Sequence, residues 1–114
     1  MKLINKTKSE VLFPEVIRAE NYFSRMVGLM GKKEFSESKA MWFTKCNSIQ
    51  TCFMRFEIDC VFVDSKGKVV KIYHGIKPWR MTNPFLRASD AIEMVAGLAK
   101  KKNLKEGDIL ECGP

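Results

Sequence analysis

The stretch Cys46–Ile72 reads CNSIQTCFMRFEIDCVFVDSKGKVVKI, and it decides the fold. It holds the densest apolar content of the chain and the clearest turn signal. Its second half begins with a nearly continuous apolar run, which is typical of a strand buried on both faces. Asp64-Ser65-Lys66-Gly67 then forms a turn in which Gly67 supplies a positive φ. We therefore expect a β-hairpin with strands at 58–64 and 68–74.

Further elements are expected on both sides of this hairpin. Tyr22, Met26 and Leu29 recur at helical spacing, which predicts an amphipathic helix over 20–30. Pro14 has no N–H to donate, so the strand around it is an edge strand or a bulged one. Short apolar or alternating runs predict strands at 2–5, 10–18, 40–45, 48–54 and 108–112.

Residues 88–103 allow two interpretations. Helix propensity favours one continuous helix with Ser89 or Asp90 as its cap. Gly97 costs such a helix about 1 kcal/mol. The alternative is a strand near 88–95 that is followed by a short helix at 97–103.

Length and charge limit the class of protein to which the chain can belong. The chain has 114 residues, which fits a single domain over 1–114 with one hydrophobic core. No apolar run is long enough to span a membrane as a helix, so no membrane partner is expected. The N-terminal residues lack the apolar core of a signal peptide, and a cytoplasmic location is the expectation. The net charge of +7 permits attraction to nucleic acid or another polyanion without establishing it.

The four cysteines are expected to be reduced thiols. They lie at positions 46, 52, 60 and 112, and no pair has the C-x2-C spacing of a zinc site. Without export, disulfides are rare. A Cys-His nucleophile would need Cys52 to meet His74, the only histidine, so buried inert thiols are favoured. No metal site and no cofactor are predicted.

An ordered set of short motifs resembles one known family. In chain order the motifs are Arg25…Gly28-Leu29-Met30, Met41-Trp42-Phe43, Cys46-Asn47-Ser48-Ile49, Met54-Arg55-Phe56, Ile58-Asp59, Val61-Phe62, Asp64…Gly67, Pro78-Trp79-Arg80, Ala96-Gly97 and Gly107-Asp108. Over about residues 15–112 the chain resembles the domain of unknown function 192 family. That resemblance implies a small β-rich fold and favours the strand-then-helix interpretation of 88–103. It implies no activity, because the family is biochemically uncharacterised.

The chain departs from the family pattern at two positions. Gln50 stands where the family usually has a histidine, and Glu57 stands where it usually has a proline before Ile58. Gln50 can act neither as a metal ligand of the histidine type nor as a general base. A catalytic interpretation built on that position is therefore weakened.

Asp59 is the most informative polar residue of the sequence. A carboxylate inside an apolar strand must find partners or shift its pKa. It is either an acid or base of a site or an anchor for a site arginine. The alternative is a structural hydrogen bond or salt bridge to Arg25 or Arg55, or to a backbone turn. Trp79 and Arg80 lie in a proline-bounded loop, where they form either a stacking platform with a cation or a lid over the core. An anion clamp is a further option, built from Arg25, Arg55, Arg80 and Arg87.

Together these patterns predict an α+β fold that is mostly β. We expect a small, partly closed mixed β-barrel with two short helices packed against it. Its predicted core comprises Leu29, Met41, Phe43, Ile49, Phe53, Ile58, Phe62, Val70, Ile72, Ile92 and Leu110.

The expected function is a non-enzymatic binding module for a small polar or anionic ligand. One alternative is an enzyme that uses Asp59 as acid or base on an anionic substrate. A second is a weak nucleic-acid binder that uses a lysine-rich surface around Lys100-Lys101-Lys102 and Lys105. The ligand site is predicted to be formed by Arg25, Gln50, Met54, Asp59, Trp79 and Arg80.

Overall fold

The expected hairpin forms the centre of the molecule. In a computed structural model, which describes residues 1–20, 37–52 and 54–114, strand β5 (Ile58–Val63) is buried throughout. It pairs antiparallel with β6 (Val69–Ile76) on one side and with β7 (Asp90–Val95) on the other. The turn Asp64–Gly67 is closed by the N–H of Gly67, which donates to the Asp64 carbonyl at 3.0 Å. The expected helix over 20–30, with Arg25 and Leu29, lies outside the described residues, and so does Phe53.

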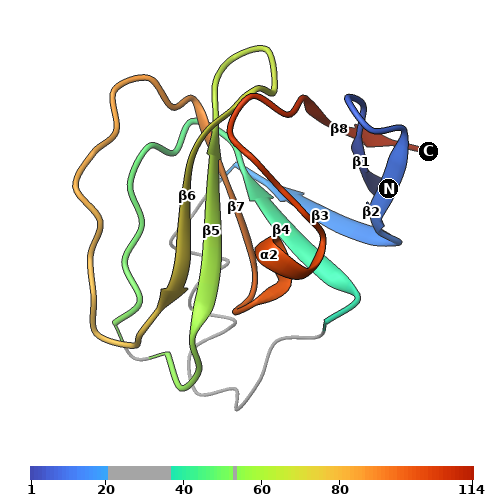
Figure 1. Cartoon of the computed structure of the whole chain (residues 1–114). Coiled ribbons are helices and arrows are strands. Elements are labelled where there is room, and N and C mark those ends of the chain that lie inside the picture. Colours follow the sequence, from blue (N-terminus) through green and yellow to red (C-terminus); the bar gives the residue numbers. More distant parts are fainter. Residues whose placement is uncertain (21–36, 53) are drawn as a thin grey trace.

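The strands form two sheets that stack over a shared core (Figure 1). The larger sheet has the order β3-β4-β7-β5-β6, in which β3 (Glu15–Ala19) and β4 (Lys39–Phe43) are parallel. The smaller sheet has the order β2-β1-β8 and joins both ends of the chain. Its strands are β1 (Lys2–Asn5), β2 (Glu10–Phe13) and β8 (Leu110–Gly113).

The larger sheet buries apolar side chains on both faces. One face packs against the smaller sheet and the short helix α2 (Leu98–Lys101), through residues such as Val61 and Ile92. The other face carries Phe43 and Phe62 and is covered by the loop segments 44–57 and 77–89. Of the predicted core residues within the described ranges, all are buried except Ile72, which is partly buried.

Two expectations are corrected by this architecture. The strand predicted over 10–18 is two strands, because Pro14 ends β2 and the chain then crosses to the other sheet as β3. The sheets do not close into a barrel: among the described strands, β3 and β6 stand at opposite edges of the larger sheet and do not pair. Of the two expected helices, the one near 97–103 occurs as α2, and the other falls outside the described ranges.

The strand predicted over 48–54 is also absent from the described part of this stretch. Residues 47–51 instead run beside residues 79–85, with backbone hydrogen bonds such as Thr82 N–H to the Ile49 carbonyl at 3.0 Å (Figure 1). Only Gln50 and Met81 form a β-bridge there. Pro78 lies just before residues 79–85 and Pro84 lies within them. Neither proline has an N–H donor, so each interrupts a continuous ladder.

Candidate functional site

A β-bulge in β6 shapes a concavity on the surface of the described chain. Ile58 pairs with Ile76 and Cys60 pairs with Tyr73, so β6 has one more residue than β5 between these pairs. The extra length falls at His74 and Gly75, and Gly75 takes a positive φ of 64°. Bulges of this kind bend a strand and re-aim its side chains. Here the bulge opens a wall of the cavity and turns His74 outward.

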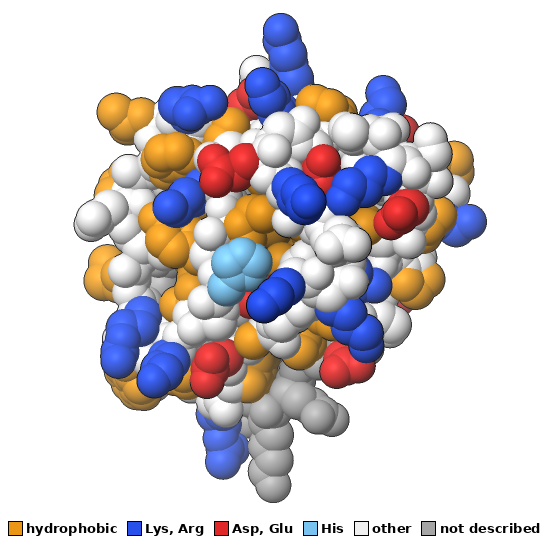
Figure 2. Space-filling view, viewed as in Figure 1, with side chains coloured by type: hydrophobic (Ala, Val, Ile, Leu, Met, Phe, Trp, Pro, Cys, Tyr) orange, Lys and Arg blue, Asp and Glu red, His pale blue; other side chains and the backbone are white. Residues whose placement is uncertain are grey.

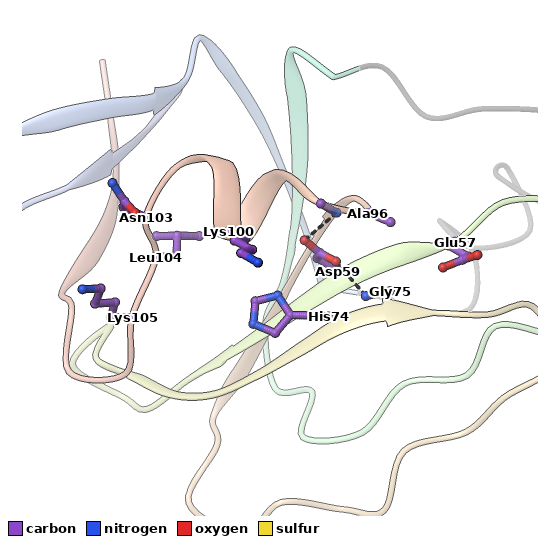
Figure 3. Close-up of a pocket in the computed structure, with 10 residues that line it drawn as sticks. Glu57, Asp59, His74, Gly75, Ala96, Lys100, Asn103, Leu104 and Lys105 are labelled. Atoms are coloured by element: carbon purple, nitrogen blue, oxygen red, sulfur yellow. Dashed lines mark hydrogen bonds between the residues drawn. The ribbon is translucent and has the colours of Figure 1, made fainter.

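Asp59 fixes the bulge to the opposite wall. Its Oδ1 accepts the N–H of Gly75 at 2.8 Å, and its Oδ2 accepts the N–H of Gly97 at 3.0 Å (Figure 3). The same Oδ2 also accepts the N–H of Ala99 at 2.9 Å. The side chain is fully buried. Gly97 has a φ of 93° and begins α2, so one carboxylate holds β5, the β6 bulge and the start of the helix together.

The cavity above Asp59 has a volume of about 750 Å³ and is called here the bulge cavity. That volume lies within the usual range of small-molecule sites, about 300–1,000 Å³. Backbone and small residues form part of its wall at Gly75, Ala96 and Gly97. Its functional side chains come from three segments and are Glu57, Asp59, His74, Lys100, Asn103 and Lys105, with Leu104 as an apolar contact.

The exposed charged side chains of the bulge cavity are the two lysines Lys100 and Lys105 and the carboxylate Glu57. Figure 2 shows the histidine in the middle of one face, with lysine and arginine side chains around it. Lys100 is on α2, and Lys105 follows it after the turn at Asn103. In the part of the chain that the structure describes, neither lysine forms an ion pair. Their charge is therefore available to an anion in the cavity.

Of the five predicted site residues that the structure describes, only Asp59 lines the bulge cavity. Gln50, Trp79 and Arg80 lie in the loop segments that cover the opposite face of the larger sheet, called here the loop layer. Met54 is buried in the core beneath that layer, and Arg25 lies outside the described residues. The five described side chains therefore do not share the bulge cavity.

Thr51 organises the loop that carries Trp79 and Arg80. Its backbone carbonyl accepts the Trp79 N–H at 3.0 Å, and its buried Oγ accepts the Arg80 N–H at 2.9 Å. Trp79 is 57% exposed and has a positive φ of 64°. The Arg80 guanidinium folds back and donates to the carbonyls of Pro78 and Trp79, at 3.5 and 3.4 Å. Arg55, Arg80 and Arg87 do not line the bulge cavity, and Arg25 lies outside the described residues, so the anion clamp stays a prediction.

Three of the four thiols are poor candidates for a reactive site. All four cysteines are free, and Cys46 and Cys60 are buried. Burial raises the pKa of Cys46 to about 11 and raises the pKa of Cys60 well above its usual value. Burial likewise raises the pKa of Cys112. These thiols remain protonated at neutral pH, which makes them poor nucleophiles. In the described ranges, no group of three or more acidic, histidine or cysteine side chains could hold a metal ion.

Sequence reasoning overlooked most of the residues of the bulge cavity, although signals for them were present. A glycine within a strand pattern indicates a bulge, and His74-Gly75 ends the predicted strand 68–74. Lys100 and Lys105 stood out as a basic cluster, and Glu57 as a departure from the family pattern. The sequence does not show that β6 and α2 are in contact. This contact brings the bulge at His74-Gly75, the two lysines and Glu57 to one place.

Comparison with known proteins gives the family. The family model of domain of unknown function 192, described as Uncharacterized ACR, matches residues 3–112. The chain belongs to this family. No helix among the described residues is long and apolar enough to cross a membrane.

Other DUF192-type proteins resemble the chain over nearly its whole length. A UPF0127 protein of Thermococcus kodakarensis is 31% identical over 116 residues, covering 98% of this chain and 73% of that protein. A UPF0127 protein of Pyrococcus horikoshii is 35% identical over 112 residues, covering 93% and 94%. A crystal structure of a protein of unknown function from Novosphingobium aromaticivorans matches with a TM-score of 0.76 at 21% identity, covering 97% of this chain and 82% of that one. The likeness to that structure shows the fold alone.

Proposed function

We propose that the protein is a binding module for a small polar or anionic ligand, and that the ligand binds in the bulge cavity. The two lysines in the lining of this cavity carry the proposal. Lys100 and Lys105 have no competing ion pairs in the described structure, and His74 and Asn103 add hydrogen-bonding groups. Ligand sites typically combine a concave apolar surface with a few converging polar groups. Ala96 and Leu104 supply such an apolar surface.

The contacts of Asp59 favour binding over catalysis. Its two carboxylate oxygens already accept three backbone N–H groups from Gly75, Gly97 and Ala99. A general acid or base must reach the reacting proton at hydrogen-bond distance. Asp59 is fully buried beneath the cavity wall, so its geometry supports a structural role.

Nucleic-acid binding is the weaker alternative. A Sinorhizobium meliloti structure named as a proposed transcription regulator matches with a TM-score of 0.74, but its identity of 21% limits the likeness to the fold. Single-stranded nucleic acid is usually bound by a basic groove combined with aromatic platforms. The bulge cavity has no aromatic residue apart from His74 among its described lining. The exposed aromatic, Trp79, belongs to the loop layer on the other face of the larger sheet.

Inorganic phosphate is a suitable probe of the proposed site. We expect a phosphate titration, followed by ¹⁵N NMR at constant ionic strength, to shift the amides of Gly75, Gly97 and Asn103 together. Replacing Lys100 or Lys105 by glutamine should weaken this binding by about fivefold, because each removes one charge contact.

Lys101→Gln is the matched control. Lys101 is next to Lys100 on α2 and is exposed, but it does not line the bulge cavity. The variant removes the same charge and should leave the phosphate affinity within about twofold, because an exposed charge that makes no contact with the ligand is weakened by water and salt. Equal effects of Lys100→Gln and Lys101→Gln, or amide shifts spread over the whole surface, would show that the cavity is not the site.

A further inference from the structure

We propose that the ligand of the bulge cavity is dipolar, with an anionic group at the Lys100–Lys105 end and an ammonium group at the Glu57 end. This inference rests on the proposed function and names the chemical class of the ligand. An ω-amino acid has this charge pattern. The basis is the distribution of unpaired charge along the cavity.

Glu57 gives the cavity an acidic end. Figure 3 shows Glu57 at one end of the site and Asn103, Leu104 and Lys105 at the other, with Lys100 and His74 between them. Glu57 is exposed and forms no ion pair within the described ranges, and the two cavity lysines form none either. The opposite charges line one concavity without neutralising each other. A ligand with two separated charges of opposite sign matches this arrangement.

Gly75 in the bulge leaves room for the Glu57 carboxylate, because it has no side chain. A Cβ atom added to Gly75 would lie 3.2 Å from the Glu57 Oε1, so the missing side chain of this glycine lets the carboxylate lie against the bulge. Asp59 holds the Gly75 backbone in place from below. The acidic end is therefore positioned by the same contacts that form the cavity wall. Asp59 itself adds no second charged contact at this end, because its oxygens are buried and taken by N–H groups.

The charge pattern disfavours ligands with an anion at each end. A second carboxylate at the Glu57 end would meet a like charge, whereas an ammonium group there would meet an opposite one. Ligands of equal length with different end groups separate these cases. We choose 6-aminohexanoate, hexanoate and adipate. All three have six carbons and a carboxylate at one end, and the other end is an ammonium group, a methyl group or a second carboxylate.

The test compares the affinities of these three probes by the same NMR titration at pH 7. We expect 6-aminohexanoate to bind about three- to fivefold more tightly than hexanoate, as for one solvent-accessible ion pair, and adipate to bind no better than hexanoate. Glu57→Gln should abolish the preference for 6-aminohexanoate over hexanoate. Glu106→Gln removes an exposed carboxylate outside the cavity and should preserve the preference.

The outcomes separate this inference from the proposed function. Phosphate binding at Gly75 and Gly97 combined with equal affinities for the three probes would overturn the dipolar ligand and leave the anion site standing. The same holds if Glu57→Gln leaves the preference for 6-aminohexanoate unchanged. Absence of binding for phosphate and for all three probes would remove both proposals.

Discussion

At the scale of single residues, Asp59 links the sequence to the candidate site. Its position within an apolar run required partners, and the structure supplies three backbone donors from two segments. An asparagine has only one acceptor oxygen, so its NH₂ group would face at least one of these donors. A buried donor left without an acceptor costs about 1–3 kcal/mol.

We therefore expect Asp59→Asn to lower the free energy of unfolding by about 2 kcal/mol, measured by urea denaturation. Asp64→Asn is the control. Asp64 Oδ1 alone accepts the N–H groups of Lys66 and Lys68 in an exposed turn, and an asparagine oxygen can replace it there. That change should cost less than about 0.5 kcal/mol. Equal stability of the two variants would show that the hydrogen bonds from Asp59 to the bulge and to α2 do not stabilise the fold.

At the scale of elements, the turn Asp64–Gly67 brings the hairpin into contact with the smaller sheet. Gly67 has a φ of 80°, and its carbonyl accepts the Leu110 N–H at 2.8 Å. A Cβ atom on Gly67 would lie 2.3 Å from the Leu110 carbonyl oxygen. Gly107 has a similar φ of 96°, but a Cβ atom there would meet nothing within 4 Å.

This pair of glycines separates backbone strain from steric overlap. Gly107→Ala should lower stability by about 1 kcal/mol, the cost of placing an L-residue in the left-handed region. Gly67→Ala carries the same cost and must also displace β8, so we expect a further loss of about 1–3 kcal/mol. Thermal unfolding of both variants measures the difference. Equal losses of stability in the two variants would mean that β8 moves away from residue 67 at Leu110 without a measurable cost.

The sequence predicted those elements whose signals are local. The hairpin was readable because an apolar run, a glycine turn and a second apolar run follow each other directly. The segment 48–54 was misread because its alternation resembles a strand, whereas its neighbour, residues 79–85, is interrupted by proline. The bulge cavity was missed because it depends on the long-range contact from Asp59 to Gly97 and Ala99, which no local pattern encodes.

At the scale of the whole molecule, the net charge of +7 must be distinguished from the local charge of the bulge cavity. A long-range field depends on the total charge and on ionic strength, whereas a site depends on where each charge lies. The neighbouring lysines Lys100 and Lys101 separate these effects, because only Lys100 lines the cavity.

We expect a single-stranded DNA oligonucleotide to bind weakly at about 20 mM salt and to dissociate by about 150 mM, because the attraction comes from released counterions. Fluorescence anisotropy measures this. Lys100→Gln and Lys101→Gln should weaken DNA binding equally, although only the first weakens phosphate binding in the cavity. The opposite result would be a DNA affinity that survives physiological salt, or one that falls for Lys100→Gln alone. Either result would mean that the nucleic acid binds in the bulge cavity and that the bound anion is a phosphate of its backbone.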